Sequence, residues 1–512
     1  MTPAALPNAT VAFLDAAVEE GRGARRALVT PAGAASYAEL LALVERAGAG
    51  LRARGVAPGD RVALLLPDGL AWAAIFFGAL RAGAVAVPLN TRLAAADLAA
   101  VLADSGAAVL VADPALAGPM REVAPRAGLP TVLDPAALLA PTGTRFEAVP
   151  VGPDAMACWL YTSGTTGSPK AAVHLHRNLL ACRHYGGEVL GVGAEDRVFA
   201  TSKLFFAYAL GSALLVPLFA RGESYLHPGW ADAETIRAVA REYRPTLFFS
   251  VPTVYARLLA ADLPADTFAS ARACVSAGER LPAEVYRAWR ARFGVEILDG
   301  IGATETIFMM LSSRPGESRA GSTGTPVPGT EARLVDAEGV PAARGARGVL
   351  WVRTPSLARG YWQRPEASGR AFDGEWFRTG DVYYVDADGH WVHCGRQDDL
   401  FKVAGQWVVP ADVEAIALRH PAVLEAGLVG AEEDSGLVKP YLFVVLREAG
   451  ADAAGLAAEL RERLAREAPA HARPREIIVV PELPRTATGK LQRHRLRDQL
   501  AASQTGEGGP QP

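Results

Sequence analysis

The chain has 512 residues, of which half are hydrophobic, and a formal net charge of only -3. This length exceeds one ordinary domain and allows a large buried core, and the balanced charge argues against disorder and against a nucleic-acid partner. The four cysteines, Cys158, Cys182, Cys274 and Cys394, are scattered without C-x-x-C spacing, so we expect reduced thiols in a cytoplasmic protein.

The N-terminal third predicts alternating helices and strands. Its first 21 residues lack a basic segment and contain acids, so no signal peptide is expected. Ser36 and Glu39 form a capping-box pattern for a helix that runs to about Arg54. Strands are then expected at 61–67, 84–90 and 107–113, with helices at 71–83 and 96–106. The apolar stretch before Arg81 is too short to span a membrane and predicts a buried helix.

The same alternation returns between about 198 and 302, with strands expected at 247–253, 271–278 and 295–302. It predicts parallel sheets covered by helices on both faces. After about 326 the pattern becomes antiparallel, with Asp388-Gly389 as a hairpin turn, and from 409 a compact α/β block follows. We therefore expect an α/β protein with a large doubly wound N-terminal region and a small C-terminal domain. The boundary is expected within CGRQDD, residues 394–399, and 502–512 as a disordered tail.

The segment YTSGTTGSPK, residues 161–170, predicts a phosphate-binding loop. It follows an apolar strand, and its glycines and hydroxyl side chains can wrap an anion while Lys170 adds positive charge. Neither G-x-x-x-x-G-K-[ST] nor G-x-G-x-x-G is present, so the two common nucleotide fingerprints are excluded. The chain has only five lysines among its 52 basic residues. This rarity favours the interpretation that lysine occurs at positions where a compact ammonium group is needed. We assign no role to Lys203 and Lys439.

This loop resembles the signature loop of the adenylate-forming superfamily, which includes acyl-CoA synthetases, luciferases and peptide-synthetase adenylation domains. Four further stretches resemble that family's motifs in the same order: DGIGATE (299–305), WFRTGD (376–381), GRQDDLFKVAGQWVVP (395–410) and PRTATGKLQR (484–493). The resemblance implies an N-terminal domain, 1–397, with doubly wound sheets and a distorted antiparallel β subdomain. It also implies a mobile C-terminal domain, 398–512, that rotates about a hinge at Asp398.

The resemblance also implies the site residues. The ATP phosphates would be bound by Thr162, Ser163, Gly164, Thr165, Thr166, Gly167 and Lys170. Asp299 would bind the adenine, Asp381 the ribose, and Arg396 the ribose or a phosphate. Thr304, Glu305 and Lys490 would be catalytic, with Glu305 holding Mg²⁺ through hard oxygen ligands. Lys490 would bridge the substrate carboxylate and the phosphate during adenylation. Structural roles are the alternatives: Asp381 as a turn cap, Glu305 as a helix cap or ion-pair partner, and Arg396 as a linker charge.

The closest resemblance is to benzoate–CoA and related aryl-CoA ligases, through KLFFAYALGS, VSAGERLP, DGIGATE and KVAGQWVVP. It implies an aromatic-acid pocket lined by Tyr185, Ala207, Tyr208, Ala277, Gly278, Gly300, Gly302 and Phe308. The chain is rich in Ala and Gly throughout, so packing is the alternative role of these residues. Phe308 stands where benzoate-specific relatives tend to carry histidine, which makes a substituted benzoate such as 2-aminobenzoate (anthranilate) an alternative to benzoate.

The activity so implied is that of an aryl-acid–CoA ligase with ATP, Mg²⁺ and coenzyme A, acting as monomer or homodimer without a membrane partner. Gly405 and Trp407 would line the CoA channel. One alternative is a free-standing adenylation enzyme that loads a carrier protein. Such enzymes usually place an acid opposite the substrate ammonium, and LFFAYAL contains none. Another alternative is a non-catalytic nucleotide-binding relative, against which Glu305 and Lys490 argue.

Overall fold

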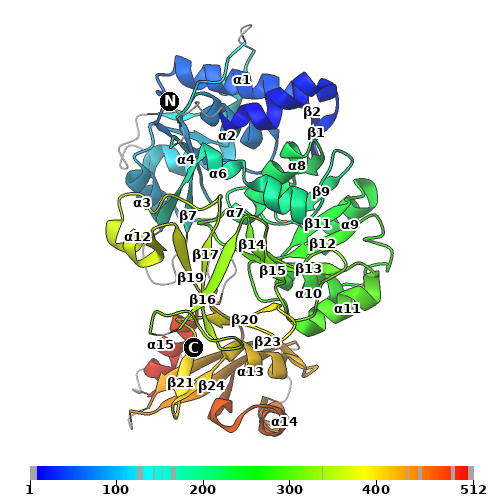
Figure 1. Ribbon diagram of the computed structural model, residues 1–512, viewed down its shortest axis with the longest axis vertical. Helices are drawn as coiled ribbons and strands as arrows, with labels where there is room; N and C mark the ends of the chain where they lie inside the picture. The colour runs from blue at the N-terminus through cyan, green and yellow to red at the C-terminus, as the bar shows by residue number, and fades with distance from the viewer. Residues whose placement is uncertain are drawn as a thin grey trace. The chain divides into compact units, whose positions relative to one another are not determined.

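The computed structural model describes residues 8–123, 131–141, 145–152, 154–162, 169–336, 338–433, 436–447, 453–485 and 491–504. The chain forms two compact units (Figure 1). Unit 1 comprises Met1–Arg333, Trp351–Thr379 and Asp388–Trp391, and unit 2 comprises Leu334–Leu350, Gly380–Ala387 and Val392–Pro512. Among the described residues, none of the helices has the length and apolar character needed to cross a bilayer.

Two sheets organise unit 1. The six-stranded sheet has the order β6 (Val132–Leu133), β5 (Val109–Ala112), β3 (Arg61–Leu65), β4 (Val85–Pro88), β7 (Met156–Thr162) and β8 (Lys170–Leu175). The nine-stranded sheet has the order β15 (Thr325–Pro326), β14 (Met309–Ser312), β13 (Ile297–Gly302), β12 (Ala273–Ser276), β11 (Leu247–Ser250), β9 (Arg197–Ala200), β10 (Glu223–Tyr225), β1 (Arg26–Thr30) and β2 (Gly33–Ser36). The inner strands pair in parallel, as the alternating sequence predicts.

Helices cover both faces of these sheets. They are α1 (Tyr37–Ala53), α2 (Leu70–Arg81), α3 (Ala95–Ser105), α4 (Pro114–Val123), α5 (Pro135–Leu139), α6 (His176–Leu179), α7 (Ala207–Ala209), α8 (Val216–Phe219), α9 (Ala233–Glu242), α10 (Pro252–Ala260), α11 (Ala283–Phe293) and α12 (Pro365–Ala371). Four short helical segments join them: η1 (Val11–Asp15), η2 (Val18–Arg22), η3 (Arg183–Val189) and η4 (Leu210–Leu215). The predicted capping box of Ser36 and Glu39 is present at the start of α1.

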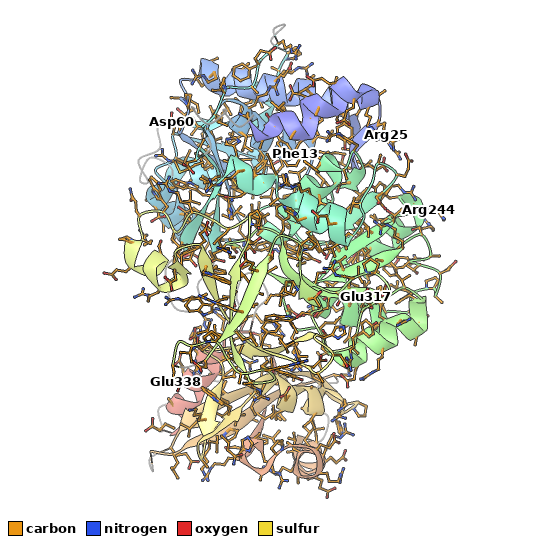
Figure 2. All side chains as sticks on the ribbon, in the orientation of Figure 1. Phe13, Arg25, Asp60, Arg244, Glu317 and Glu338 are labelled. Atoms are coloured by element: carbon orange, nitrogen blue, oxygen red, sulfur yellow. The ribbon has the colours of Figure 1, made fainter. Side chains whose placement is uncertain are left out.

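The strand side chains alternate between separate cores, because successive residues of a strand point to opposite faces. On β11, Leu247 and Phe249 join the core that contains α1 and α2, whereas Phe248 joins the core beneath α9, α10 and α11. In the first of these cores, Phe13 of η1, which is labelled in Figure 2, packs against Phe77 and Phe219. Burial on both faces explains why these strands are continuous apolar runs in the sequence.

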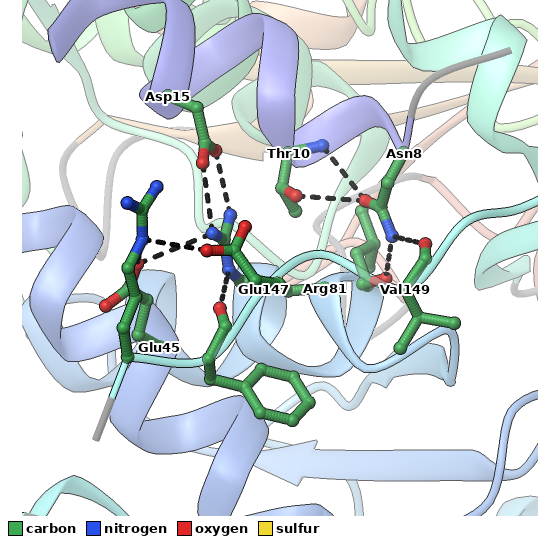
Figure 3. A network of polar contacts seen from close by, with 10 residues as sticks. Asn8, Thr10, Asp15, Glu45, Arg81, Glu147 and Val149 are labelled. Atoms are coloured by element: carbon green, nitrogen blue, oxygen red, sulfur yellow. Dashed lines mark hydrogen bonds and ion pairs between the residues drawn. The ribbon is translucent and has the colours of Figure 1, made fainter.

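Arg81, which ends the apolar run of α2, is completely buried. Its guanidinium donates two hydrogen bonds to Asp15, at 2.8 and 3.0 Å, and one to the Phe146 carbonyl at 2.7 Å (Figure 3). Glu45 approaches it at 3.4 Å. This pairing offsets the cost of burying a charge and ties the N-terminal segment to α2.

The remaining β structure includes a five-stranded sheet. It has the order β16 (Glu331–Val335), β17 (Gly348–Arg353), β19 (Trp376–Val385) and β18 (Phe372–Asp373), and β20 (Trp391–Arg396) pairs with β19. Asp388-Gly389 lies in the predicted turn between β19 and β20, and Gly389 has a φ of 89°. In unit 1, the Trp391 carbonyl accepts from Thr323. In unit 2, Val382 and Cys394 pack with Val409. The two compact units interleave in sequence, and the domain boundary at 397/398 stays a prediction.

Unit 2 also contains β21 (Phe401–Val403), β22 (Gln406–Val408), β23 (Val423–Glu432), β24 (Val438–Leu446), β25 (Glu476–Val479), α13 (Pro410–Leu418), α14 (Ala453–Glu467), η5 (Ala470–Ala472) and α15 (Arg493–Gln504). Strands β23, β24 and β25 form one sheet, and β21 and β22 form a hairpin. The helix α15 continues to Gln504, so the stretch predicted as a tail from 502 begins in a helix. Residues 505–512 lie outside the described part of the chain.

Candidate functional site

The predicted catalytic pair Thr304-Glu305 lies in the turn between β13 and β14. Neighbouring strands hold both backbone carbonyls: His174 Nε2 donates to the Thr304 oxygen at 2.8 Å, and the Ala358 amide donates to the Glu305 oxygen at 2.8 Å. His174 is completely buried, and burial lowers its pKa to about 4. The turn is therefore fixed by an uncharged imidazole and by an adjacent backbone amide.

The Glu305 side chain is held by a second residue from the 358–362 segment. Glu305 is 8% exposed, and the Tyr361 hydroxyl donates to its Oε1 at 2.5 Å. Lys170 Nζ lies 5.2 Å from the centroid of the Tyr361 ring, within the range of a cation–π contact. The structure thus brings the predicted magnesium carboxylate and the predicted phosphate-binding lysine to the same tyrosine.

The ends of the predicted phosphate loop face each other across a strand pair. Thr162 at the end of β7 is the register partner of Lys170 at the start of β8. This antiparallel pairing returns the chain directly, so the loop between them is short and its two ends are fixed. The predicted ligands Ser163, Gly164, Thr165, Thr166 and Gly167 lie outside the described residues.

The predicted acid-pocket residues gather in one hydrophobic core. Tyr185 of η3, Ala207, Ala277 and Phe308 are buried in that core, and Tyr208 packs against it. The Tyr208 hydroxyl donates to the Ser250 and Val275 carbonyls, both at 3.1 Å, which satisfies its polar end in the apolar surroundings. Tyr185 and Phe308 also line the same small cavity of about 10 Å³.

Two predicted pocket glycines face neighbouring backbone. A Cβ at Gly302 would lie 2.8 Å from the Phe308 oxygen, and a Cβ at Gly300 would lie 2.9 Å from the Leu311 oxygen. These glycines therefore permit the close approach of β13 and β14, which is a packing role. Gly278, in the loop after β12, has a φ of 90° that disfavours any residue with a side chain. Their contact with a substrate stays a prediction.

Asp299 lies on β13 with its side chain in the interior. It is 6% exposed, and burial raises the pKa of its carboxyl group well above its usual range, while Ser276 and Arg280 lower it by less. Burial likewise raises the pKa of Tyr185, which the nearby Asp299 carboxylate raises further. The role of Asp299 toward adenine stays a prediction.

In unit 2, the predicted ribose ligand Asp381 is held by two side chains from the neighbouring strand. Arg396 Nη1 donates to Asp381 Oδ2 at 3.2 Å, and His393 Nε2 lies 3.3 Å from Oδ1. Gly380 has a φ of 75°, and a Cβ there would lie 2.9 Å from an Arg396 nitrogen. The Gly-Asp pair of WFRTGD therefore gives the Arg396 guanidinium room beside the Asp381 carboxylate.

The remaining predicted residues of unit 2 are largely exposed. Asp398 lies in the turn after β20, and Gly405 has a φ of 77° in the turn between β21 and β22. Trp407 is 45% exposed, with Lys402 Nζ 4.7 Å from its ring centroid. Their hinge and CoA-channel roles remain predictions. The predicted catalytic Lys490 lies outside the described residues.

Sequence reasoning missed several supporting residues. Tyr361 and His174 touch predicted ligands that lie 56 and 130 residues away in sequence. His393 touches Asp381 from the neighbouring strand, 12 residues away. Lys203, to which we assigned no role, is buried, with its Nζ 2.6 Å from the His227 carbonyl and 3.6 Å from Asp68. Burial raises the pKa of Asp68 to about 6. Lys203 fixes the segment before Ala207. The scarcity of lysine in the chain was the one sequence feature that pointed to a specific role for it.

The fit to magnesium rests on a single carboxylate. In the described part of the chain, no cluster of three or more His, Cys, Asp or Glu residues could hold a metal ion. Mg²⁺ commonly binds through one or two carboxylates together with nucleotide phosphates. Glu305 is fixed in place and suits such a shared site, with the remaining ligands coming from ATP and water.

Comparison with known proteins identifies the family of the chain. The family of AMP-binding enzymes matches residues 14–362, and the AMP-binding enzyme C-terminal domain matches residues 412–490. A benzoate–CoA ligase of Thauera aromatica is 41% identical over 496 residues, covering 93% of each chain. An anthranilate–CoA ligase of Pseudomonas aeruginosa is 40% identical over 457 residues, covering 87% of this chain and 88% of that one.

Solved structures give the same result. The anthranilate CoA ligase AuaEII in complex with anthranoyl-AMP superposes with a TM-score of 0.91 at 36% identity, covering 98% of this chain and 99% of that one. A benzoate CoA ligase from Burkholderia xenovorans LB400 gives 0.89 at 39% identity, covering 96% and 100%. These similarities confirm the fold class. The chain belongs to the AMP-binding enzymes of the adenylate-forming superfamily, close to the aryl-CoA ligases.

Proposed function

We propose that the chain is an ATP-dependent aryl-acid–CoA ligase for benzoate or a substituted benzoate such as anthranilate. The observation that carries this is the position of the Thr304-Glu305 turn. It lies between Gly302 and Phe308 in the chain, and Phe308 shares one buried core with Tyr185 and Ala207. An acid whose ring entered this apolar region would have its carboxylate beside the polar turn.

The proposed reaction has two steps. The carboxylate oxygen attacks the α-phosphorus of ATP, forming the acyl-adenylate and releasing pyrophosphate. The CoA thiol, after losing its proton, then attacks the acyl carbon and displaces AMP. ATP with Mg²⁺ supplies the phosphorus electrophile and the charge neutralisation.

Within this scheme, the residues of the chain bind and orient the substrates. Thr162 and Lys170 would meet the phosphates, Glu305 the metal, and Asp381 with Arg396 the ribose. Lys490 would bridge the carboxylate and the α-phosphate. We also propose a cytoplasmic location, which the four buried, unpaired cysteines support.

A panel of substituted benzoates with ATP and CoA, scored by AMP release, tests the activity. Octanoate is the comparison acid, since it is apolar but not aromatic. We expect a benzoate to be preferred. Better turnover of octanoate would refute the aryl-acid assignment, and transfer of labelled acid to a holo-carrier protein in preference to CoA would refute the ligase assignment.

A further inference from the structure

The backbone around Tyr361 is fixed by an edge pairing with β8. The Val173 amide donates to the Gly360 carbonyl at 3.0 Å, and the Arg359 amide donates to the Val173 carbonyl at 2.9 Å. The Trp362 amide completes the pairing with the Ala171 carbonyl at 2.9 Å. Segment 358–362 therefore behaves as an added strand beside the strand that begins at Lys170.

The same segment is bound to the catalytic turn on its other side. The Ala358 amide holds the Glu305 carbonyl, and the Tyr361 hydroxyl holds the Glu305 side chain through Oε1. Among the described residues, none donates a hydrogen bond to Oε2. The tyrosine thus selects one orientation of the carboxylate and leaves its second oxygen for another ligand.

The Tyr361 ring has a separate pair of contacts. Phe372 meets it edge-on at 5.4 Å, and the Lys170 ammonium lies 5.2 Å from its centroid. The ring is held by an aromatic neighbour and in turn supports the lysine at the end of the phosphate loop. The hydroxyl and the ring of one residue therefore serve two different charged groups.

We propose that Tyr361 is a positioning residue whose hydroxyl orients Glu305 for Mg²⁺ and whose ring places Lys170 for the ATP phosphates. This inference rests on the proposed function, specifically on Glu305 as the metal-binding carboxylate. A carboxylate fixed before the metal arrives binds it more tightly than one that must be ordered, because the loss of side-chain freedom has already occurred. The two halves of the proposal can be separated by substitution.

Tyr361→Phe removes the hydroxyl and keeps the ring. Calorimetric titration of ATP into the full-length protein, in EDTA and over a series of Mg²⁺ concentrations, measures binding without turnover. The quantity to compare is the Mg²⁺ concentration that produces half of the metal-induced gain in ATP affinity. We expect it to rise about tenfold, because one hydrogen bond to a charged group contributes on that scale. ATP affinity in EDTA should stay unchanged, because Lys170 keeps its aromatic support.

Tyr361→Leu removes the ring as well. It should show the same Mg²⁺ shift and, in addition, weaker ATP binding in EDTA, by about threefold, the scale of an exposed cation–π contact. Tyr286→Phe is the matched control, since its hydroxyl bonds to Ser318 in a different core. It should bind ATP and Mg²⁺ as the unmodified protein does.

Glu305→Gln distinguishes the failure of this inference from failure of the metal assignment. If Glu305→Gln leaves the Mg²⁺ dependence unchanged, Glu305 does not hold the metal, and both the assignment and the role of Tyr361 are wrong. If Glu305→Gln shifts the Mg²⁺ dependence of ATP binding and Tyr361→Phe does not, only the positioning role of Tyr361 is wrong. Support requires a shift in both single variants and no further shift when Tyr361→Phe is added to Glu305→Gln, since Tyr361 acts on the metal only through the Glu305 carboxylate.

Discussion

Two buried histidines, one of which contacts the catalytic turn, have lowered pKa values. His174 on β8 donates to the Thr304 carbonyl, and His176 at the start of α6 accepts from the Ala9 amide at 3.1 Å. Burial lowers the pKa of each imidazole to about 4. The unfolded chain, with pKa near 6.5, takes up these protons first as the pH falls. Stability from the neutral imidazoles is therefore complete above pH 6.5 and is lost as the pH falls toward 4.

His174→Gln tests this linkage. Glutamine keeps a donor but does not titrate, so the fall in the free energy of unfolding between pH 6.5 and 4 should become shallower by about 1.4 kcal/mol per pH unit. Urea denaturation at stepped pH measures this slope. An equal slope in His174→Gln and the unmodified protein would show that His174 is not neutral when folded.

Asp381 gives a second prediction for a single residue. Its carboxylate is preoriented by Arg396 and His393 within unit 2. Asp381→Ala should weaken ATP binding at least tenfold, because each hydrogen bond to a charged group contributes roughly 1.5–3 kcal/mol. Calorimetry measures the affinity, with Asp386→Ala in the same strand connection as a comparison. Unchanged ATP binding would remove Asp381 from the nucleotide site.

At the level of secondary-structure elements, the close approach of β13 and β14 limits the size of the residues that fit at positions 300 and 302 of the predicted acid pocket. We expected Gly300 and Gly302 to leave space for a flat ring, but each faces a backbone oxygen of β14 or of the turn before it at under 3.0 Å. Gly211 of η4 similarly brings its backbone close to the Phe308 ring, 3.0 Å from a Cβ placed there. The glycines therefore set the separation of the elements that carry Phe308.

Gly302→Ala should consequently destabilise the fold. A Cβ that cannot be accommodated without moving backbone costs about 1–3 kcal/mol in the free energy of unfolding. Chemical denaturation measures this loss. Gly369→Ala in α12, where a Cβ meets nothing within 4 Å, should be neutral or slightly stabilising. If Gly302→Ala raised KM for the aromatic acid without any loss of stability, Gly302 would be a pocket residue and not a packing residue.

At the level of the whole molecule, two compact units carry different parts of the proposed chemistry. Unit 1 carries Lys170, Thr304 and Glu305, and unit 2 carries Asp381, Arg396 and the exposed Asp398. The family resemblance predicts that the C-terminal domain, 398–512, rotates about Asp398, and we propose that this rotation separates the two half-reactions. Proline at 398 would restrict the rotation because it fixes φ near -65°.

Lys490→Ala should abolish adenylate formation and largely spare thioester formation from a supplied aryl-adenylate. Asp398→Pro should do the reverse, retaining adenylation and losing CoA transfer. Single-turnover assays of each half-reaction measure both effects. Asp398→Ala and Lys439→Ala are the controls, since the first keeps backbone freedom and the second removes a lysine elsewhere in unit 2. Equal loss of both steps in both variants would refute rotation about Asp398.

The sequence by itself determined the class of fold, the order of its elements and the family. Apolar periodicity and the Ser36–Glu39 cap depend on neighbours along the chain, so they predicted β3, α1, α2 and β11 well. The motif residues were identifiable for the same reason, since each motif is a short continuous stretch. The similarity to aryl-CoA ligases confirms the family that these motifs indicated.

Only the tertiary structure decided which side chains support the motifs. Tyr361 lies 56 residues from Glu305, and His174 lies 130 from Thr304, so no local pattern links them. The burial of Lys203 and Asp299 likewise depends on strands and loops that meet only after folding. Contacts that form when strands pair in a sheet join residues that are far apart in the chain. The periodic pattern of a single helix or strand therefore does not predict them. In a chain so rich in Gly and Ala, the sequence alone therefore could not distinguish glycines that line a pocket from glycines that allow close packing.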